Sequence, residues 1–152
     1  MEKKEGVYKS YHKNKQLYEE VNYIDGKKQG IYKSYHINGK LWTEVNYIND
    51  KKNGIYKLYF ENGCELSSTD NNNLGQLKIE INYIDDKRNG IYKSYFDNGQ
   101  LDEEVNYIDD NRNGIYKSYY QNGQLWDEVN YINDWCNEFI NRIMIMDNYG
   151  LK

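Results

Sequence analysis

The sequence contains no proline and no alanine, and only two of its residues are cysteine. Proline is the residue that most often interrupts paired strands, so its absence is typical of a chain of regularly paired strands. Cys64 and Cys136 are too few for a disulfide framework and occupy different positions in the pattern described below. We therefore expect two free thiols in a reducing, intracellular compartment, the cytoplasm.

Long apolar segments are also missing. No run approaches the roughly 18 apolar residues of a transmembrane helix, and no apolar stretch follows the charged N-terminus, so we expect neither a membrane span nor a signal peptide. A mean hydropathy of −1.08 argues against a thick hydrophobic core. The charges are nearly balanced, with 20 basic and 24 acidic residues and a net charge of −4. This balance argues against nucleic acid as a partner, because nucleic-acid binders need a basic surface.

Tyrosine is abundant, with 18 residues, and the chain repeats itself every 24 residues. The glycines that open the units are Gly6, Gly30, Gly54, Gly90 and Gly114. The step from Gly54 to Gly90 is one period plus twelve residues, which predicts an insertion at about 64–75. A fixed short period indicates a repeat array, in which each unit stacks on its neighbours.

Each unit predicts one β-hairpin. In the second unit, residues 31–36 and 41–48 are rich in strand formers and flank Asn38-Gly39, a strong signal for a type I′ turn. A two-residue loop pairs Tyr32 with Val45, Lys33 with Glu44 and Tyr35 with Trp42. The face of Tyr32 and Val45 is mostly apolar, and the face of Lys33 and Glu44 mixes aromatic side chains with charges.

Lysines and tyrosines recur at fixed positions. The lysines are Lys9, Lys33, Lys57, Lys93 and Lys117, and each has a glutamate in the opposing position. We interpret these pairs as devices that fix register; the alternative is a row of lysines that binds acidic lipid headgroups. The tyrosines form three columns, which are interpreted as the spine of a thin sheet or, where exposed, as a binding strip.

Three features interrupt the pattern. Lys15 replaces the turn glycine in the first unit, which predicts a weaker or different turn. The insertion predicts an exposed loop, either a recognition feature or a neutral one.

Residues 134–146 show apolar pairs at helical spacing, with Asp134 as a possible cap, and predict a short helix that covers the sheet edge. A decayed sixth unit and a membrane-surface helix are the alternatives. The array then spans residues 1–133 and the cap 134–152.

The pattern Y-K-S-Y-x-x-N-G-x-L resembles the MORN repeat, in particular the variant class of bacteria and giant viruses. Serine stands where the usual motif has glycine, and histidine, phenylalanine or tyrosine stands where it has tryptophan. The resemblance implies an all-β, elongated single sheet of successive antiparallel hairpins and a scaffold rather than a catalyst. Members of the family have been proposed to recruit proteins or to bind phosphoinositides. The amino-acid usage is typical of a low-GC genome.

We therefore predict a non-enzymatic protein-interaction scaffold that needs no cofactor and no metal. His12 and His36 are interpreted as packing residues, since no third metal ligand accompanies them. The candidate partner-binding residues are Tyr35, Trp42, Tyr59, Tyr95, Tyr119 and Trp126, because exposed aromatic side chains are common binding anchors. The partner is an unidentified protein. Binding of acidic phospholipid by the lysine column, at a membrane surface, and self-assembly into a homo-oligomer are the alternatives.

Overall fold

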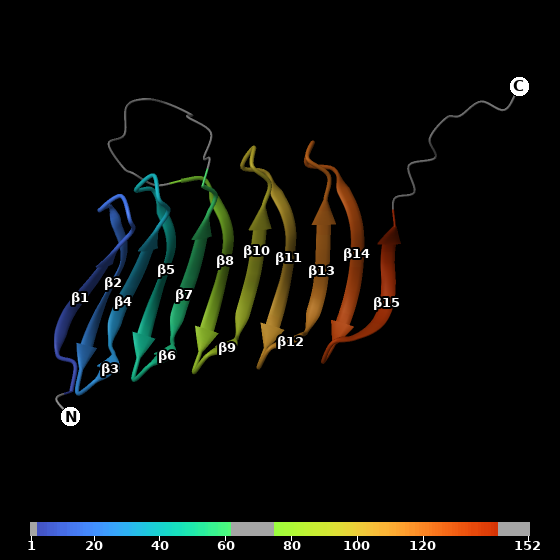
Figure 1. Cartoon of the computed structure of the whole chain (residues 1–152). Helices are drawn as coiled ribbons and strands as arrows, with labels where there is room; N and C mark the ends of the chain where they lie inside the picture. The colour runs from blue at the N-terminus through green and yellow to red at the C-terminus, as the bar shows by residue number, and fades with distance from the viewer. Residues whose placement is uncertain (1–2, 62–74, 143–152) are drawn as a thin grey trace, which may run out of the picture.

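The computed structural model describes residues 3–61 and 75–142. All regular elements in these ranges are β-strands, and they form one open antiparallel sheet (Figure 1). The longer strands are neighbours in sequence order from β1 to β15, and the two-residue strands β3, β6, β9 and β12 each pair with the strand before them. The sheet is therefore a ribbon one layer thick with β1 and β15 at its edges. The prediction of a single antiparallel sheet of successive hairpins is confirmed.

Each unit supplies one strand of six residues and one of eight. The six-residue strands are β1 (Gly6–Tyr11), β4 (Gly30–Tyr35), β7 (Gly54–Tyr59), β10 (Gly90–Tyr95) and β13 (Gly114–Tyr119). The eight-residue strands are β2 (Leu17–Ile24), β5 (Leu41–Ile48), β8 (Leu77–Ile84), β11 (Leu101–Ile108) and β14 (Leu125–Ile132). Two-residue strands precede the later units: β3 (Lys27–Lys28), β6 (Lys51–Lys52), β9 (Lys87–Arg88) and β12 (Asn111–Arg112). The last strand is β15 (Trp135–Arg142).

The predicted register is correct over the middle of the hairpin and wrong at its loop. Lys33 lies opposite Glu44, and the neighbouring pairs agree with the prediction. Beyond Ser34 a β-bulge shifts the register, and Tyr35 lies opposite Leu41 instead of Trp42. The same shift occurs in all five hairpins.

The loop chemistry explains this shift. Within the loop of the second unit Gly39 alone has a positive φ, of 83°, whereas a type I′ turn needs two such residues. The Gly39 amide donates to the His36 carbonyl at 2.8 Å, and the His36 amide donates to the Lys40 carbonyl at 2.8 Å. These bonds define a three-residue loop in which a type I turn is followed by a left-handed glycine and a bulge. The predicted type I′ turn at Asn38-Gly39 is therefore wrong.

Type I′ turns occur instead between units, in the segments read from the sequence only as polar connections. Asn49 and Asp50 have φ values of 51° and 69°, and the equivalent residues of the other units share this conformation. Lys15 also adopts a positive φ, of 70°, and the first hairpin keeps the same loop hydrogen bonds as the others. The prediction of a different first turn is wrong, and Lys15 bears the left-handed strain of roughly 1–2 kcal/mol.

The predicted C-terminal helix is wrong over residues 135–142, where β15 pairs with β14. Asp134 lies in a type I′ turn with a φ of 65° and does not cap a helix. The free edge of β14 offers backbone hydrogen bonds to this segment, and that outweighs the helical spacing of the apolar pairs. Earlier units have a positive-φ glycine where Glu138 stands, and β15 continues past this position as one strand whose register against β14 shifts on either side of it. This agrees with the alternative of a decayed sixth unit; residues 143–152 lie outside the described residues.

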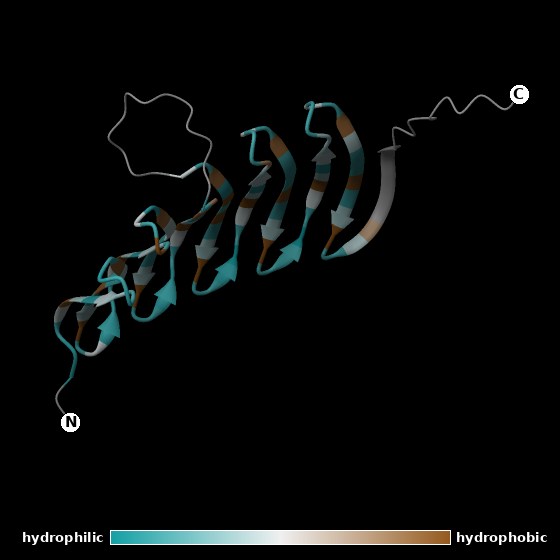
Figure 2. Cartoon of the chain, turned by 45° about the horizontal axis from the view of Figure 1, so that its top comes forward, coloured by the Kyte–Doolittle hydropathy of each residue, from teal (hydrophilic) through white to brown (hydrophobic). Residues whose placement is uncertain are grey.

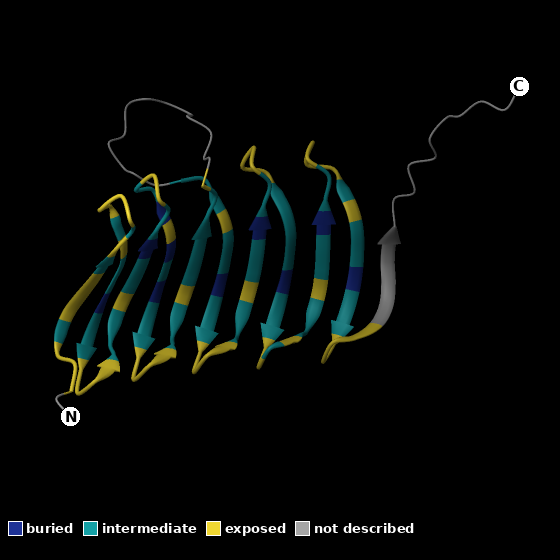
Figure 3. Ribbon diagram, viewed as in Figure 1, coloured by how far each residue is buried: buried dark blue, intermediate teal, exposed yellow. Residues whose placement is uncertain are grey.

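One face of the sheet, the core face, holds the buried side chains. The buried residues of this face include Val21, Ser34, Thr43, Val45, Ile81, Ser94, Val105, Ser118 and Val129. Ser34 and Thr43 share a 2.6 Å hydrogen bond between their hydroxyls, and in the third unit Leu58 and Ile79 replace this polar pair. Figure 3 shows the buried positions recurring from hairpin to hairpin. Since the described residues form no second layer over the ribbon, large side chains of the same face must cover these small ones.

Tyrosine pairs provide that cover. Tyr32 and Tyr47 pack edge to face with ring centroids 5.9 Å apart, and the Lys28 ammonium lies 5.2 and 5.0 Å from the two centroids. The equivalent tyrosines of every unit form the same edge-to-face pair. Two of the three predicted tyrosine columns therefore form the spine of the sheet. The insertion predicted at about 64–75 lies, except for Gly75, outside the described residues. β7 and β8 nevertheless pair in the common register across it.

Candidate interaction surface

The other face, the outer face, carries a continuous row of alternating charges, which we call the charge row. Its members, from β1 to β14, are Lys9, Glu20, Lys33, Glu44, Lys57, Glu80, Lys93, Glu104, Lys117 and Glu128. Each is register-paired with the next, both within hairpins and between them. The Lys33 ammonium lies 3.3 Å from a Glu44 carboxylate oxygen, and Lys9 and Lys57 form the equivalent ion pairs at 3.3 and 3.9 Å.

This row contains all five lysines of the predicted lipid site. Every one of them lies opposite the glutamate expected from the sequence, and four lie beside a second glutamate of the preceding unit. With equal numbers of both signs in register, the row presents no net positive charge. Exposed ion pairs of this kind contribute little stability, about 0–1 kcal/mol each, so their main effect is to fix register.

The predicted aromatic residues do not form one strip. Tyr35, Tyr59, Tyr95 and Tyr119 are half-buried. The Tyr35 hydroxyl donates to Glu20 at 3.0 Å, and the Tyr119 hydroxyl donates to Glu104 at 3.4 Å. Burial and then the hydrogen bond to Glu20 raise the pKa of Tyr35 to about 12. These two phenols thus hold carboxylates of the charge row in place.

The tryptophans are more exposed, Trp42 by 39% and Trp126 by 51%. Trp42 packs against His36 with ring centroids 5.5 Å apart, and Trp126 stacks on Tyr120 at the same distance. The bulge shifts the register by one residue, so Tyr35 lies opposite Leu41 rather than opposite Trp42. Trp42 can then pack against His36 at the loop. His12 contacts Tyr18 in the same way, and its Nε2 forms a 2.9 Å hydrogen bond with the Tyr35 carbonyl.

A row of exposed aliphatic side chains crosses the outer face near the type I′ turns, and we call it the isoleucine stripe. Its members are Val7, Ile24, Ile31, Ile48, Ile55, Ile84, Ile91, Ile108, Ile115 and Ile132. Their exposed fractions lie between 44% and 66%. Figure 2 shows hydrophobic bands recurring along the ribbon, and Figure 3 shows exposed bands at one height on β4, β7, β10 and β13.

The stripe residues are not among those predicted from the sequence as a site. The signal was available, since Ile31 and Ile48 have the same strand parity as Lys33 and Glu44 and therefore share their face. Within a hairpin the two isoleucines lie diagonally across the strand pair, where side chains are about 7–8 Å apart. The ten side chains thus form a zigzag along the ribbon rather than isolated apolar residues.

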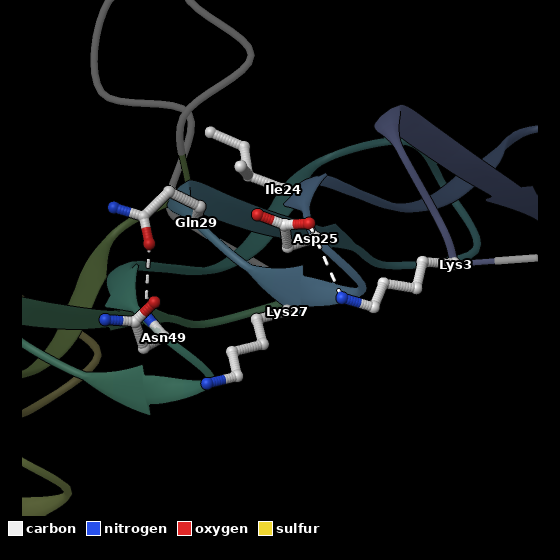
Figure 4. Close-up of a pocket in the computed structure, with 6 residues that line it drawn as sticks. All are labelled: Lys3, Ile24, Asp25, Lys27, Gln29 and Asn49. Atoms are coloured by element: carbon white, nitrogen blue, oxygen red, sulfur yellow. Dashed lines mark hydrogen bonds and ion pairs between the residues drawn. The ribbon is translucent and has the colours of Figure 1, made fainter.

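A shallow, open pocket of about 490 Å³ lies at the turns of the first two units, lined by Lys3, Ile24, Asp25, Lys27, Gln29 and Asn49 (Figure 4). Its polar groups bond to one another: Lys3 pairs with Asp25 at 3.5 Å, and the backbone amide of Asn49 donates to the side-chain oxygen of Gln29 at 3.0 Å. Over residues 3–61 and 75–136, whose side chains the structure describes, no cluster of potential metal ligands is found. Cys136 is an exposed free thiol.

The repeats match a known family. Residues 4–25, 28–49, 88–109 and 112–133 match the family model described as the MORN repeat variant, and together they span more than half of the chain. The chain belongs to the MORN repeat variant family. The third MORN unit, which carries the insertion, lies between the second and third matched segments. Comparison with curated proteins gives no match. The described part of this MORN array holds no helix able to cross a bilayer.

Proposed function

We propose that this MORN array is a non-enzymatic scaffold that holds a polypeptide partner against its outer face. The isoleucine stripe carries the proposal. Ten aliphatic side chains exposed by 44–66% present on the order of 500 Å² of apolar surface along one line. The largest apolar patch of a typical monomer is about 300–600 Å² and is often functional.

The neighbouring groups support a protein partner. The charge row runs beside the stripe and supplies both donors and acceptors at a regular spacing, which suits a polypeptide better than an anionic lipid surface. We propose that the exposed indoles of Trp42 and Trp126 also contact the partner. They lie beyond the charge row, on the same strands as Glu44 and Glu128. Indole side chains are frequent hot spots in protein interfaces.

A charge placed in the stripe tests the proposal. In Ile115→Glu the new carboxylate lies in the stripe, whereas in Gln121→Glu it lies on the exposed loop of the same hairpin. Both tagged chains, checked for β-structure by circular dichroism, are used for affinity capture from the native source, and the captured protein is then purified and titrated directly. We expect the control to bind it as the natural chain does and Ile115→Glu to bind at least about tenfold more weakly. Equal binding by the two variants would rule out the stripe as the contact surface.

A further inference from the structure

We infer that the partner of the outer face is a second copy of this chain, packed face to face with its strand order reversed. This inference depends on the proposed function, because both use the isoleucine stripe. A two-fold axis parallel to the strands, between β7 and β8, relates the two copies. Each row of the outer face then lies over the same row of the other copy, because this rotation preserves position along the strands and reverses only the order of strands.

The charge row is complementary to itself under this rotation. It has ten members that alternate strictly in sign, so reversing its order places every lysine opposite a glutamate. Lys9 of one copy faces Glu128 of the other, Lys33 faces Glu104, and Lys57 faces Glu80. A row with an odd number of members would instead place like charges together. Opposite charges across an interface fix register and disfavour other alignments.

The isoleucine stripe is compatible with the same arrangement. On β1, β4, β7, β10 and β13 the stripe residue is the second of its strand, and on the returning strands it is the last. Reversal lays each six-residue strand over an eight-residue strand, so the aliphatic side chains of the two copies interleave instead of colliding end to end. Facing sheets pack by this kind of interdigitation.

The outer face offers enough area for a stable dimer. The stripe supplies on the order of 500 Å² per copy, and the charge row and the indoles on the same face add to it, toward the roughly 800 Å² per partner that a standard interface buries. Neighbouring strands keep similar axes, with a gradual turn from β1 to β13 (Figure 1), which allows contact over several strands on either side of the axis. An isologous contact of this type closes after two copies, so the inference predicts a dimer and not a filament.

Two measurements on the full chain test the geometry. Sedimentation velocity over a range of concentrations reports the oligomeric state. Zero-length carbodiimide cross-linking with peptide mass spectrometry reports which carboxylates lie beside which lysines. Lys9 and Glu128 lie on β1 and β14, nine strand steps and therefore roughly 43 Å apart in one copy. A Lys9–Glu128 or Lys33–Glu104 link can form only between copies, and we expect both in the dimer fraction.

Complementary charge variants make the test specific. Lys33→Glu and Glu104→Lys each place like charges in contact in their own homodimers, and we expect each alone to dimerise about tenfold more weakly. A mixture of the two variants matches every facing pair and restores dimerisation as a heterodimer. Lys33→Glu mixed with Glu128→Lys, whose facing residue is Lys9, leaves a mismatch and gives no such rescue. Circular dichroism of each variant confirms that it is folded before mixing.

Other outcomes separate this inference from the function on which it rests. A chain that stays monomeric at all concentrations, or a dimer whose links join β1 to β1 along the sheet edge, overturns the face-to-face arrangement. If such a chain still captures another protein through Ile115, the scaffold function stands and only the self-partner is wrong. If Ile115→Glu changes neither dimerisation nor capture, both proposals fail.

Discussion

At the scale of single residues, the face of the sheet on which a side chain lies determines whether it is buried or exposed. Val45 and Ile48 lie on the same strand, three residues apart, yet their exposed fractions are 2% and 44%. Among the described residues no second layer covers the outer face, and the core face is covered by its own tyrosines and the cations that lie over them. Stability therefore depends on a short list of small residues packed beneath aromatic rings, not on the total apolar content.

A pair of matched substitutions tests this division. Ile81 is 2% exposed on the core face of β8, and Ile84 is 50% exposed on the outer face of the same strand. Ile81→Ala should lower the free energy of unfolding by about 2–4 kcal/mol, because it leaves a cavity beneath the tyrosine pair. Ile84→Ala should change it by less than about 0.5 kcal/mol. Urea titration at a concentration below dimerisation measures both, and similar losses would contradict the assignment of faces.

At the scale of elements, the turns determine where each strand begins and how units join. Each type I′ turn is tied to the preceding unit. The Asp86 amide donates to the Lys52 carbonyl at 3.0 Å, and the Asp86 carboxylate accepts from the Lys52 amide at 2.8 Å. Three other units repeat this pair of bonds. The same aspartates therefore shape the turn and join neighbouring hairpins.

Two substitutions at Asp86 separate these roles. Asp86→Gly removes the side-chain hydrogen bond and keeps an easy left-handed backbone, so it should cost about 1 kcal/mol of unfolding free energy. Asp86→Ala loses the same bond and adds left-handed strain at a φ of 69°, so it should cost roughly 1 kcal/mol more. Thermal and urea unfolding provide the comparison. An alanine variant as stable as the glycine variant would show that the backbone is not strained there.

At the scale of the whole molecule, the ribbon behaves as a stack of equivalent units, since each hairpin pairs only with its neighbours. Stability in such arrays is approximately a sum of unit terms and interface terms. The charge row and the isoleucine stripe extend over all five hairpins and are therefore features of the whole ribbon. Their continuity depends on every unit joining the next in the same register.

Removal of one period tests the modular description. Deletion of residues 90–113 joins Asn89 to Gly114 and recreates the natural Asn-Gly junction, with Lys117 taking the place of Lys93 beside Glu80. We expect a folded chain with a lower unfolding free energy and a smaller urea m-value, because less surface is buried. The control deletes residues 90–101, half a period. It leaves a strand running in the wrong direction, and we expect it to lose the β-sheet signal in circular dichroism. A full-period deletion that also unfolds would contradict the description.

The amino-acid sequence by itself determined the repeat, the hairpins, the central register and the division into two faces, because a period of 24 residues and strand alternation are both local properties. The glutamate opposite each lysine of the charge row was also predictable from the sequence. The turn types, the bulge that separates Tyr35 from Trp42, and the strand at Trp135–Arg142 were decided by the tertiary structure. They depend on backbone hydrogen bonds offered by neighbouring strands, which no single unit of sequence contains. The continuity of the charge row and of the isoleucine stripe has the same origin, since both exist only once separate hairpins align edge to edge.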